Sequence, residues 1–320
     1  MYDDHKFKKV TPLVSTIPCK VLIARIILFI YLPNMILSAV IHLTPAFKAP
    51  VPMALGHKAQ GWLLGEVQSY LPVLSERLHN EGGYTVSSIH RQLEGQPGSH
   101  YLRVTSLVSD LTDVLLEAVL PNIKTISFSP RDEKQRANGE ELDKRPPLDF
   151  RVEGFAIDRV SHPLARLTSF AELVGEAEKN NIMDIVFASP TAFGSNGVNQ
   201  PLPLPTLILN SWMEKWKKYA PAGKQFGYSF PQFAKDCILL NGLWDVHTEN
   251  WNLPGSGHSL GFVGRLQMKT RSINECPEWK LVWETALRDW QALSAFSLFC
   301  GTGRYASIGM GQTSLLSSLQ

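Results

Sequence analysis

A glycine-rich segment near the C-terminus has the composition of a phosphate-binding loop. Residues 301–312 read GTGRYASIGMGQ, with four glycines in the first eleven residues and an arginine near their centre. Glycine removes the side chain where a backbone must come close to a ligand, and backbone N–H groups can then face phosphates. The segment therefore predicts contacts to a phosphate-bearing ligand, made by Gly301, Gly303, Arg304, Gly309 and Gly311.

The same segment is also compatible with a turn that binds nothing. The dinucleotide-binding fingerprint requires glycines that follow a first strand and open a helix, whereas these follow a long helix. Glycine-rich turns between a helix and a last strand are common. Both interpretations stay open from these residues alone.

Length and composition indicate two compact domains. The chain has 320 residues, of which 44% are hydrophobic and 19% charged, which excludes a disordered chain. The net charge of +2 means that any nucleic-acid contact must come from a local basic patch. The four cysteines (Cys19, Cys237, Cys276 and Cys300) form no C-x-x-C pair, so we expect neither a metal clamp nor a redox centre, and a reducing cytoplasm as the setting.

The N-terminal residues are expected to lie outside the fold. Val21 to Leu32 are apolar except for Arg25, but these twelve residues are short of the roughly 20 that a membrane-spanning helix needs. No small-x-small cleavage site follows them, which disfavours a secretory signal. We therefore expect residues 1–34 to be an extension, with the fold beginning at Met35 and no membrane association.

The first half has the element order of a ferredoxin-like domain. A strand is expected at 36–43, helices at 55–70 and 73–79, strands at 84–87 and 101–108, a helix at 110–120 capped by Ser109, and a strand at 123–128. This β-α-β-β-α-β order predicts two helices on one face of a four-stranded antiparallel sheet, with the other face free.

A charged segment separates the halves. Residues 131–147 carry both charge signs and end in two prolines, so we expect a linker or surface hairpin between domains at 35–130 and 148–320. In the second half we expect strands at 150–160, 183–187 and 260–269, and helices from a Ser169/Glu172 capping box to about 179, at 204–219, 230–239 and 279–300. The aromatic residues of the last helix are expected to form core. The fold class is α+β.

Several of these segments together resemble a known family. The glycine-rich segment, the helix before it and FASPTAF at 187–193 resemble the CRISPR-associated repeat-RNA endoribonucleases of the RAMP superfamily. In the first half, ALG at 54–56, GWLL at 61–64, Leu78-His79 and YTVS at 84–87 are similar to that family's first helix and the segment after it. The resemblance runs from about Met35 to Gln312.

The resemblance implies two tandem ferredoxin-like (RRM-like) domains that bind CRISPR repeat RNA and cleave the precursor. Family cleavage needs no metal ion or cofactor: the ribose 2′-OH attacks the scissile phosphate, leaving a 2′,3′-cyclic phosphate and a 5′-OH. Such a reaction needs a general base, a general acid, and positive charge at the phosphorane. The partners that the resemblance implies are repeat RNA, mature crRNA and other CRISPR effector subunits.

The resemblance also selects among the nine histidines, whose ordinary pKa of about 6.5 suits acid–base catalysis. His79 matches the family position after a leucine, and His57, within the first helix, is second; His42 and His90 are weaker. A histidine at the C-terminal end of a helix can also have a purely structural role, in which the helix dipole stabilises its charged form. Leu64 stands where several relatives have a tyrosine, and no lysine follows His79 within ten residues, so a His–Tyr–Lys set is incomplete.

Positive charge is expected from other residues. Lys58, Arg77 and Arg91 are candidates at the transition state, although such cations are commonly just solvated. Arg265, together with Arg304 and the glycine-rich segment, is expected to bind RNA phosphates. Lys215, Lys217 and Lys218 are more typical of a solvated helix face. The alternative to an endoribonuclease is a non-catalytic crRNA-binding subunit of an interference or transposon-targeting complex.

Overall fold

The computed structural model describes most of the chain from Asn34 onward. The described residues are 34–48, 50–52, 55–91, 100–128, 147–195, 198–224, 226, 228–253 and 257–316. Residues 1–33 of the predicted extension (1–34) and residues 131–146 of the predicted linker (131–147) lie outside these residues. None of the described helices is both long and apolar enough to cross a membrane.

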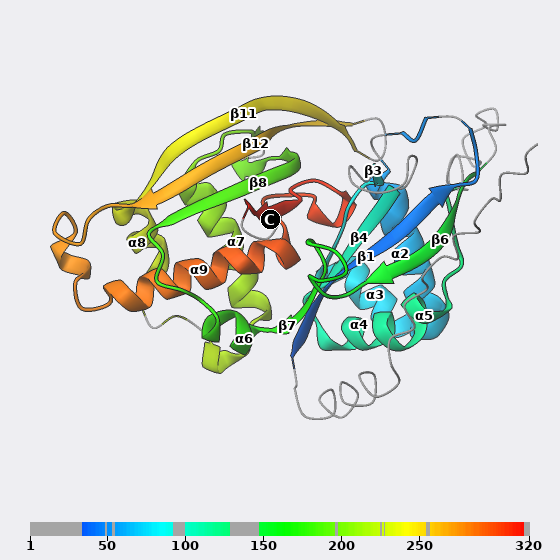
Figure 1. The fold of residues 1–320 in the computed structure, drawn as a ribbon, viewed down its shortest axis with the longest axis horizontal. Helices are drawn as coiled ribbons and strands as arrows, with labels where there is room; N and C mark the ends of the chain where they lie inside the picture. The colour runs from blue at the N-terminus through cyan, green and yellow to red at the C-terminus, as the bar shows by residue number, and fades with distance from the viewer. Residues whose placement is uncertain are drawn as a thin grey trace, which may run out of the picture. The chain divides into compact units, whose positions relative to one another are not determined.

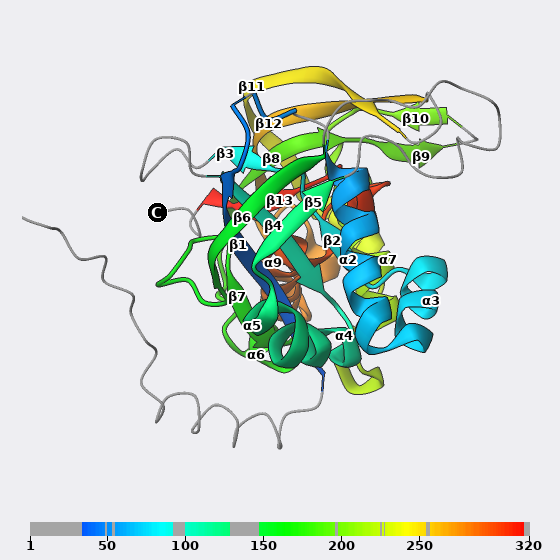
Figure 2. The same ribbon diagram turned by 90° about the vertical axis from the view of Figure 1, so that its right-hand side faces the viewer.

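The helices of the first half lie on one face of its sheet, as predicted, but the sheet has more strands than the expected four. Its strands run in the order β2-β4-β1-β6-β5, and all pairs are antiparallel (Figure 2). The helices α2, α3 and α4 lie on one face of this sheet. The elements are β1 (Met35–Pro45), α2 (Gly56–Tyr70), α3 (Pro72–Glu81), β2 (Tyr84–Val86), β3 (His90–Arg91), β4 (His100–Ser106), α4 (Ser109–Val114), a π-helical segment (Leu115–Val119), α5 (Leu120–Asn122) and β5 (Thr125–Phe128).

Two local predictions in this half are corrected. The residue before α4 is Val108, and no side chain caps that helix, so Ser109 is not its cap. The strand at β6 (Leu148–Ala156) was assigned to the second domain but pairs with both β1 and β5. It separates two strands that are neighbours in a plain ferredoxin-like sheet. The next strand, β7 (Arg166–Ser169), also pairs with β1, so the domain boundary at residue 148 is misplaced.

The second half has the complete ferredoxin-like order. Its sheet runs β11-β12-β8-β13 and curves over α7 and α9 (Figure 1). The capping box of Ser169 and Glu172 is present, but α6 ends at Gly175. The elements are α6 (Phe170–Gly175), β8 (Ile182–Thr191), β9 (Phe193–Ser195), β10 (Val198–Gln200), α7 (Pro205–Tyr219), α8 (Phe230–Cys237), β11 (Ile238–Asn252), β12 (His258–Thr270), α9 (Trp283–Cys300) and β13 (Thr313–Leu315), with short 3₁₀ turns at Ala222–Lys224, Pro277–Trp279 and Ala306–Ile308.

The aromatic residues of the second half form its core, as predicted. Trp290 and Phe296 of α9 are fully buried and pack with Trp212 and Trp216 of α7. Phe187 on β8 lies in the same cluster, because alternate residues of a strand face the helices. The sheet's other face therefore carries the intervening residues.

The second half covers part of the first sheet on the face away from its helices. Thr105 on β4 donates its hydroxyl hydrogen bond to the carbonyl oxygen of Phe299 at 2.6 Å. The buried Arg103 guanidinium donates to Gln312 Oε1, with Nε at 3.1 Å. The segment between β6 and β7 also contacts this face, since Ser38 on β1 donates to the Leu164 carbonyl at 2.6 Å. The prediction that this face stays free is therefore wrong.

Candidate functional site

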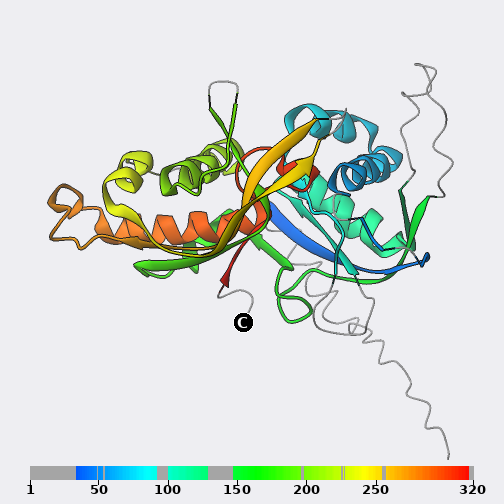
Figure 3. The ribbon, with the colours of Figure 1, turned by 90° about the horizontal axis from the view of Figure 1, so that it is seen from above.

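The glycine-rich segment (301–312, hereafter the glycine loop) is packed between the two halves. It leaves α9, passes the start of α2, and returns to pair with β8 through β13 (Figure 3). Gly301, Gly303, Gly309 and Gly311 all have positive φ, at 61°, 73°, 99° and 62°. Residues that have a side chain rarely adopt positive φ, which explains why glycine stands at each position.

The N–H groups of these glycines bind acceptors of the protein itself. Gly303 donates to Ser211 Oγ at 2.8 Å, and Gly311 donates to the Pro190 carbonyl at 3.0 Å. Gly301 donates to the Ser297 carbonyl, and the N–H of Gly309 lies 3.4 Å from the Ala306 carbonyl. The expectation that these four N–H groups face phosphates is therefore corrected: the glycines shape the loop.

The exposed part of the loop is its tip. Arg304 is exposed, and its guanidinium lies 5.0 Å from the centre of the Tyr305 ring. Its Nη1 donates to Asn199 Oδ1 at 3.1 Å. No carboxylate among the described residues forms an ion pair with Arg304. Its charge can therefore reach a phosphate.

The start of α2 lies against the loop, as the position of Gly56 shows. A Cβ at Gly56 would lie 2.6 Å from the carbonyl carbon of Ile308 and 2.9 Å from the Cα of Gly309. Only glycine permits this approach. The next residues, His57 and Lys58, follow Gly56 directly in α2 and are half-buried.

A lysine of α7 holds the loop from the other side. The Lys215 ammonium donates to the carbonyl oxygens of Cys300 and Gly301, each at 3.0 Å, and of Gly303 at 3.3 Å. Burial lowers its pKa. Lys215 was expected on a solvated face, but it satisfies the carbonyls that end α9 and begin the loop.

The same helix binds the end of α3, where His79 lies. Lys218 Nζ and the Tyr219 hydroxyl both donate to the Glu81 carbonyl, the latter at 3.0 Å. The Tyr219 ring packs against Gly83, since a Cβ there would lie 3.4 Å from its Cε1. His79 is exposed two residues before Glu81. Residues 215 and 218 are one turn apart, about 4.5 Å along the axis, so one turn of α7 links the loop to the His79 segment.

The remaining predicted cations have individual surroundings. Arg77 pairs with Asp110 at 2.7 Å, and both side chains are about half exposed. Arg91 lies in β3 opposite His100. Arg265 Nη2 lies 2.7 Å from Asp184 Oδ1, on the face of the second sheet that points away from α9. Its charge is therefore neutralised, unlike that of Arg304.

The two weaker histidine candidates belong to a different cluster. His42 lies 5.7 Å from His162, and His90 stacks on Tyr101 at 5.3 Å, on the first sheet's face away from α2. Burial lowers the pKa of His90 to about 4, with a further contribution from Arg103. The His90 ring is therefore neutral at pH 7. The described residues contain no group of three or more metal-ligating side chains.

A family model matches part of the second half of the chain. Residues 185–313, which span α7 and the whole glycine loop, match the model of the CRISPR-associated endoribonuclease Cas6. The resemblance to the Cas6 family is confirmed. None of the curated proteins matches the chain.

Solved Cas6 structures share the fold over nearly all of the described chain. A Cas6 of Thermus thermophilus (TTHB231) in a product complex gives a TM-score of 0.67 at 24% identity, covering 88% of this chain and 100% of that chain. A second Cas6 product complex (TTHA0078) gives 0.63 at 22% identity, with 88% and 99% covered. A RAMP protein that binds different RNA substrates gives 0.52 at 13% identity, with 88% and 99% covered. The predicted pair of ferredoxin-like folds is thereby confirmed.

The contacts made by α7 are what sequence reasoning missed. Lys215 and Lys218 stand among other lysines of one helix, and no local pattern distinguishes a buried ammonium from a solvated one. Their partners Gly301 and Glu81 are 86 and 137 residues away. The same holds for Tyr219, the last residue of α7, whose hydroxyl donates to the Glu81 carbonyl.

Proposed function

We propose that this chain is a metal-independent endoribonuclease that binds CRISPR repeat RNA and cleaves the precursor within each repeat. The observation that carries the proposal is the arrangement around α7. Lys215 holds the glycine loop, and Lys218 with Tyr219 holds the end of α3, which bears His79. An exposed imidazole and an exposed, unneutralised Arg304 thus belong to one connected assembly.

The proposed reaction is an in-line displacement by the RNA's own 2′-hydroxyl. The 2′-oxygen bonds to the adjacent phosphorus while the bond from phosphorus to the 5′-oxygen breaks. A base accepts the 2′-OH proton, and an acid delivers a proton to the departing 5′-oxygen. The products are a 2′,3′-cyclic phosphate and a 5′-OH. Imidazole can serve either step near pH 7.

We assign the catalytic imidazole to His79, with His57 as the alternative. His79 is exposed, so RNA can reach it, and α7 places a lysine and a tyrosine within two residues of it along α3. The His–Tyr–Lys set was incomplete in the sequence around His79. Lys218 and Tyr219 of α7 supply a lysine and a tyrosine near it. A Cas6 of the same fold was solved as a histidine-to-alanine variant.

Arg304 and Lys58 are the cations we propose for phosphate contact near the loop. Arg77 can also contribute, because an exposed ion pair such as that with Asp110 holds together by only about 0–1 kcal/mol. Arg91 remains a candidate through its place in β3. The proposal also includes that the chain stays bound to the mature crRNA after cleavage and associates with other CRISPR effector subunits.

The proposal is tested by incubating the protein with a repeat RNA in excess EDTA. We expect cleavage to continue and to stop when a single 2′-deoxy nucleotide replaces the one before the cut. Product ends should react as 2′,3′-cyclic phosphate and 5′-OH. Cleavage that requires a divalent ion contradicts the mechanism, and tight binding without any cleavage favours the crRNA-binding subunit instead.

A further inference from the structure

The outer face of the second sheet presents a single flat indole to solvent. Trp244 on β11 is 42% exposed, although every other described tryptophan of the second half is more buried. It pairs in register with Arg265 on β12, and the guanidinium lies 4.6 Å from the ring centre. One face of the ring therefore rests on a cation, and the ring remains accessible.

The backbone around Trp244 is irregular in ways that hold the ring against the sheet. A Cβ at Gly242 would lie 2.9 Å from Cζ3 of the Trp244 ring, so only glycine leaves room for it. The pairing with β12 shifts register on both sides, between Leu240 and Gly242 and between Trp244 and His247. Asp245 has a positive φ of 53°. Such bulges re-aim side chains at functional surfaces.

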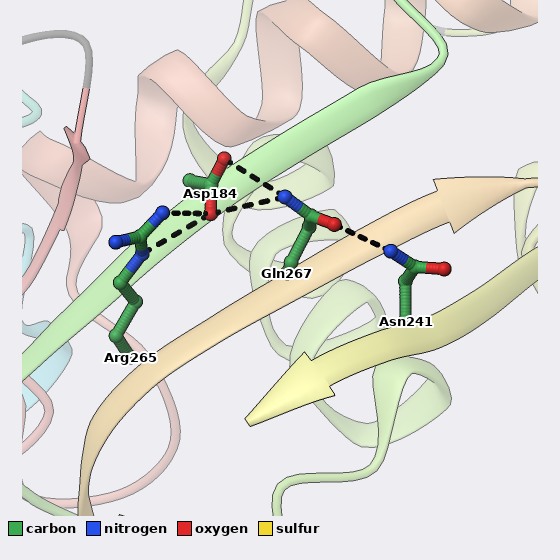
Figure 4. A network of polar contacts seen from close by, with 4 residues as sticks. All are labelled: Asp184, Asn241, Arg265 and Gln267. Atoms are coloured by element: carbon green, nitrogen blue, oxygen red, sulfur yellow. Dashed lines mark hydrogen bonds and ion pairs between the residues drawn. The ribbon is translucent and has the colours of Figure 1, made fainter. Parts of the chain in front are cut away.

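A polar network holds the Arg265 guanidinium in place (Figure 4). Asp184 Oδ1 accepts from Arg265 Nε at 3.1 Å and from Nη2 at 2.7 Å. Gln267 Nε2 donates to both Asp184 oxygens, at 3.3 and 3.2 Å, and Asn241 donates to Gln267 Oε1. Three strands thus hold one arginine in place, and the arginine supports the indole.

We propose that Trp244 stacks on an unpaired base of the repeat RNA, with Arg265 as its positioning residue; this rests on the proposed RNA-binding function. An aromatic ring with one supported face and an accessible surface suits base stacking, since single-stranded RNA is recognised largely in this way. In this proposal the role of Arg265 is to hold the Trp244 ring in position. The exposed Lys269, on the same face of β12, is placed to contact the backbone of the same strand.

The surroundings favour a nucleotide over a protein partner. The exposed Leu240 and Leu243 pair with Met268 and Leu266, which face the core, so these leucines lie on the other side of the sheet. On the outer face the indole lies beside the Asp184–Arg265–Gln267 network, and further along β11 the exposed Leu239 pairs with Lys269. A polar, charged frame around one aromatic ring is typical of base recognition.

The register relates this position to the glycine loop. Trp244, Arg265, Val186 and Ser314 occupy one row across the four strands. Three strand spacings place Trp244 about 14 Å from β13, which follows the loop. The helix α7 lies on the other face of the sheet, so the stacked base is distinct from the one at the scissile phosphate near His79.

The test compares Trp244→Ala with Leu243→Ala, a matched exposed residue on the opposite face. Affinity for repeat RNA with its unpaired flanks is measured by fluorescence anisotropy, and cleavage by single turnover at saturating protein. We expect Trp244→Ala to weaken binding about 5- to 100-fold. The saturated cleavage rate stays at the wild-type value, Trp244→Phe restores most of the affinity, and Leu243→Ala binds as the wild type does.

An abasic scan of the flanks sharpens the test. One abasic position should weaken wild-type binding and leave the Trp244→Ala variant unaffected, since the stacking partner is already missing. Wild-type affinity of Trp244→Ala overturns the proposal, as does a wild-type dimer that this substitution alone dissociates, because the indole is then a protein contact. If wild-type protein binds no RNA, the proposed function fails as well, whereas failure confined to Trp244 leaves that function standing.

Discussion

The two ferredoxin-like sheets have related strand orders but opposite surroundings on their second faces. In the first, the face away from the helices is contacted by the chain's own second half through Thr105 and Arg103. In the second, the corresponding face remains open at Arg265 and Trp244. The same topology thus forms an internal interface in the first sheet, called the joint below, and an exposed surface in the second sheet.

This difference teaches where function can reside. A covered face contributes to stability and fixes the glycine loop, because Gln312 at the end of the loop accepts from Arg103. An open face is free to bind. We therefore expect substitutions at the joint to affect folding first, and substitutions on exposed residues to affect RNA first.

The largest effect on stability is expected where α2 meets the loop. Gly56→Ala places a Cβ against the Ile308 backbone, which cannot move as a flexible side chain would. We expect a loss of about 3 kcal/mol, as for other overpacked sites, and a melting temperature lower by roughly 5 °C or more. Thermal unfolding measures it.

Gly65→Ala in the same helix is the control. A Cβ at Gly65 meets nothing within 4 Å. Alanine favours helix over glycine by about 0.5–1 kcal/mol, so this variant should be slightly more stable than the wild type. Equal effects of the two substitutions would show that the contact between α2 and the loop does not matter.

A smaller loss is expected from the lysine that holds the loop. Lys215→Met removes the donor for three carbonyls, of which those of Cys300 and Gly301 lie at 3.0 Å. We expect about 1–3 kcal/mol less stability, and slower RNA cleavage because the loop loses its support. Lys217→Met, at an exposed position of the same helix, is the control in chemical denaturation and should remain close to the wild type.

Much of the fold could be predicted from periodicity, whereas the joint could not. The apolar spacing of α2 and the aromatic spacing of α9 indicate their helices and their buried faces directly. Nothing local in β6 indicates that it pairs with β1 and β5, since a strand's partner depends on the whole sheet. The bulged edge strand β11 was not predicted, because its exposed faces lack alternation.

The candidate site was predicted in parts. The glycines of the loop were correctly singled out by type, but their N–H partners, such as Ser211 Oγ, come from distant elements. Burial of the Lys215 ammonium depends on the carbonyls at the end of α9, which a sequence does not display. His79 and His57 were selected from the nine histidines through the family resemblance, and their assignment to the reaction stays a proposal.

The smallest effect concerns how the free energy of unfolding depends on pH through His162, which lies between β6 and β7. Burial lowers the pKa of His162 to about 4, with contributions from His42 and Arg103, and its Nδ1 accepts from the Leu164 N–H at 3.1 Å. The unfolded chain binds this proton near pH 6.5, so stability is present above that pH and is lost as pH falls toward 4.

Denaturation at pH 7.5 and pH 5 measures this slope. Between these values we expect His162 to contribute a loss of about 1–2 kcal/mol in the wild type. His162→Asn should reduce the slope by that amount. An unchanged slope would show that His162 titrates alike in the folded and unfolded chain.

The most direct test of the account is single-turnover cleavage of a repeat RNA by His79→Ala and His57→Ala, with affinity measured in parallel on a 2′-deoxy substrate. We expect His79→Ala to bind as the wild type does and to cleave at least about 100-fold more slowly, the usual contribution of a general acid or base. His57→Ala should keep most of the rate. Full cleavage by His79→Ala, with the loss appearing in His57→Ala instead, would contradict the account and move the reaction to the start of α2.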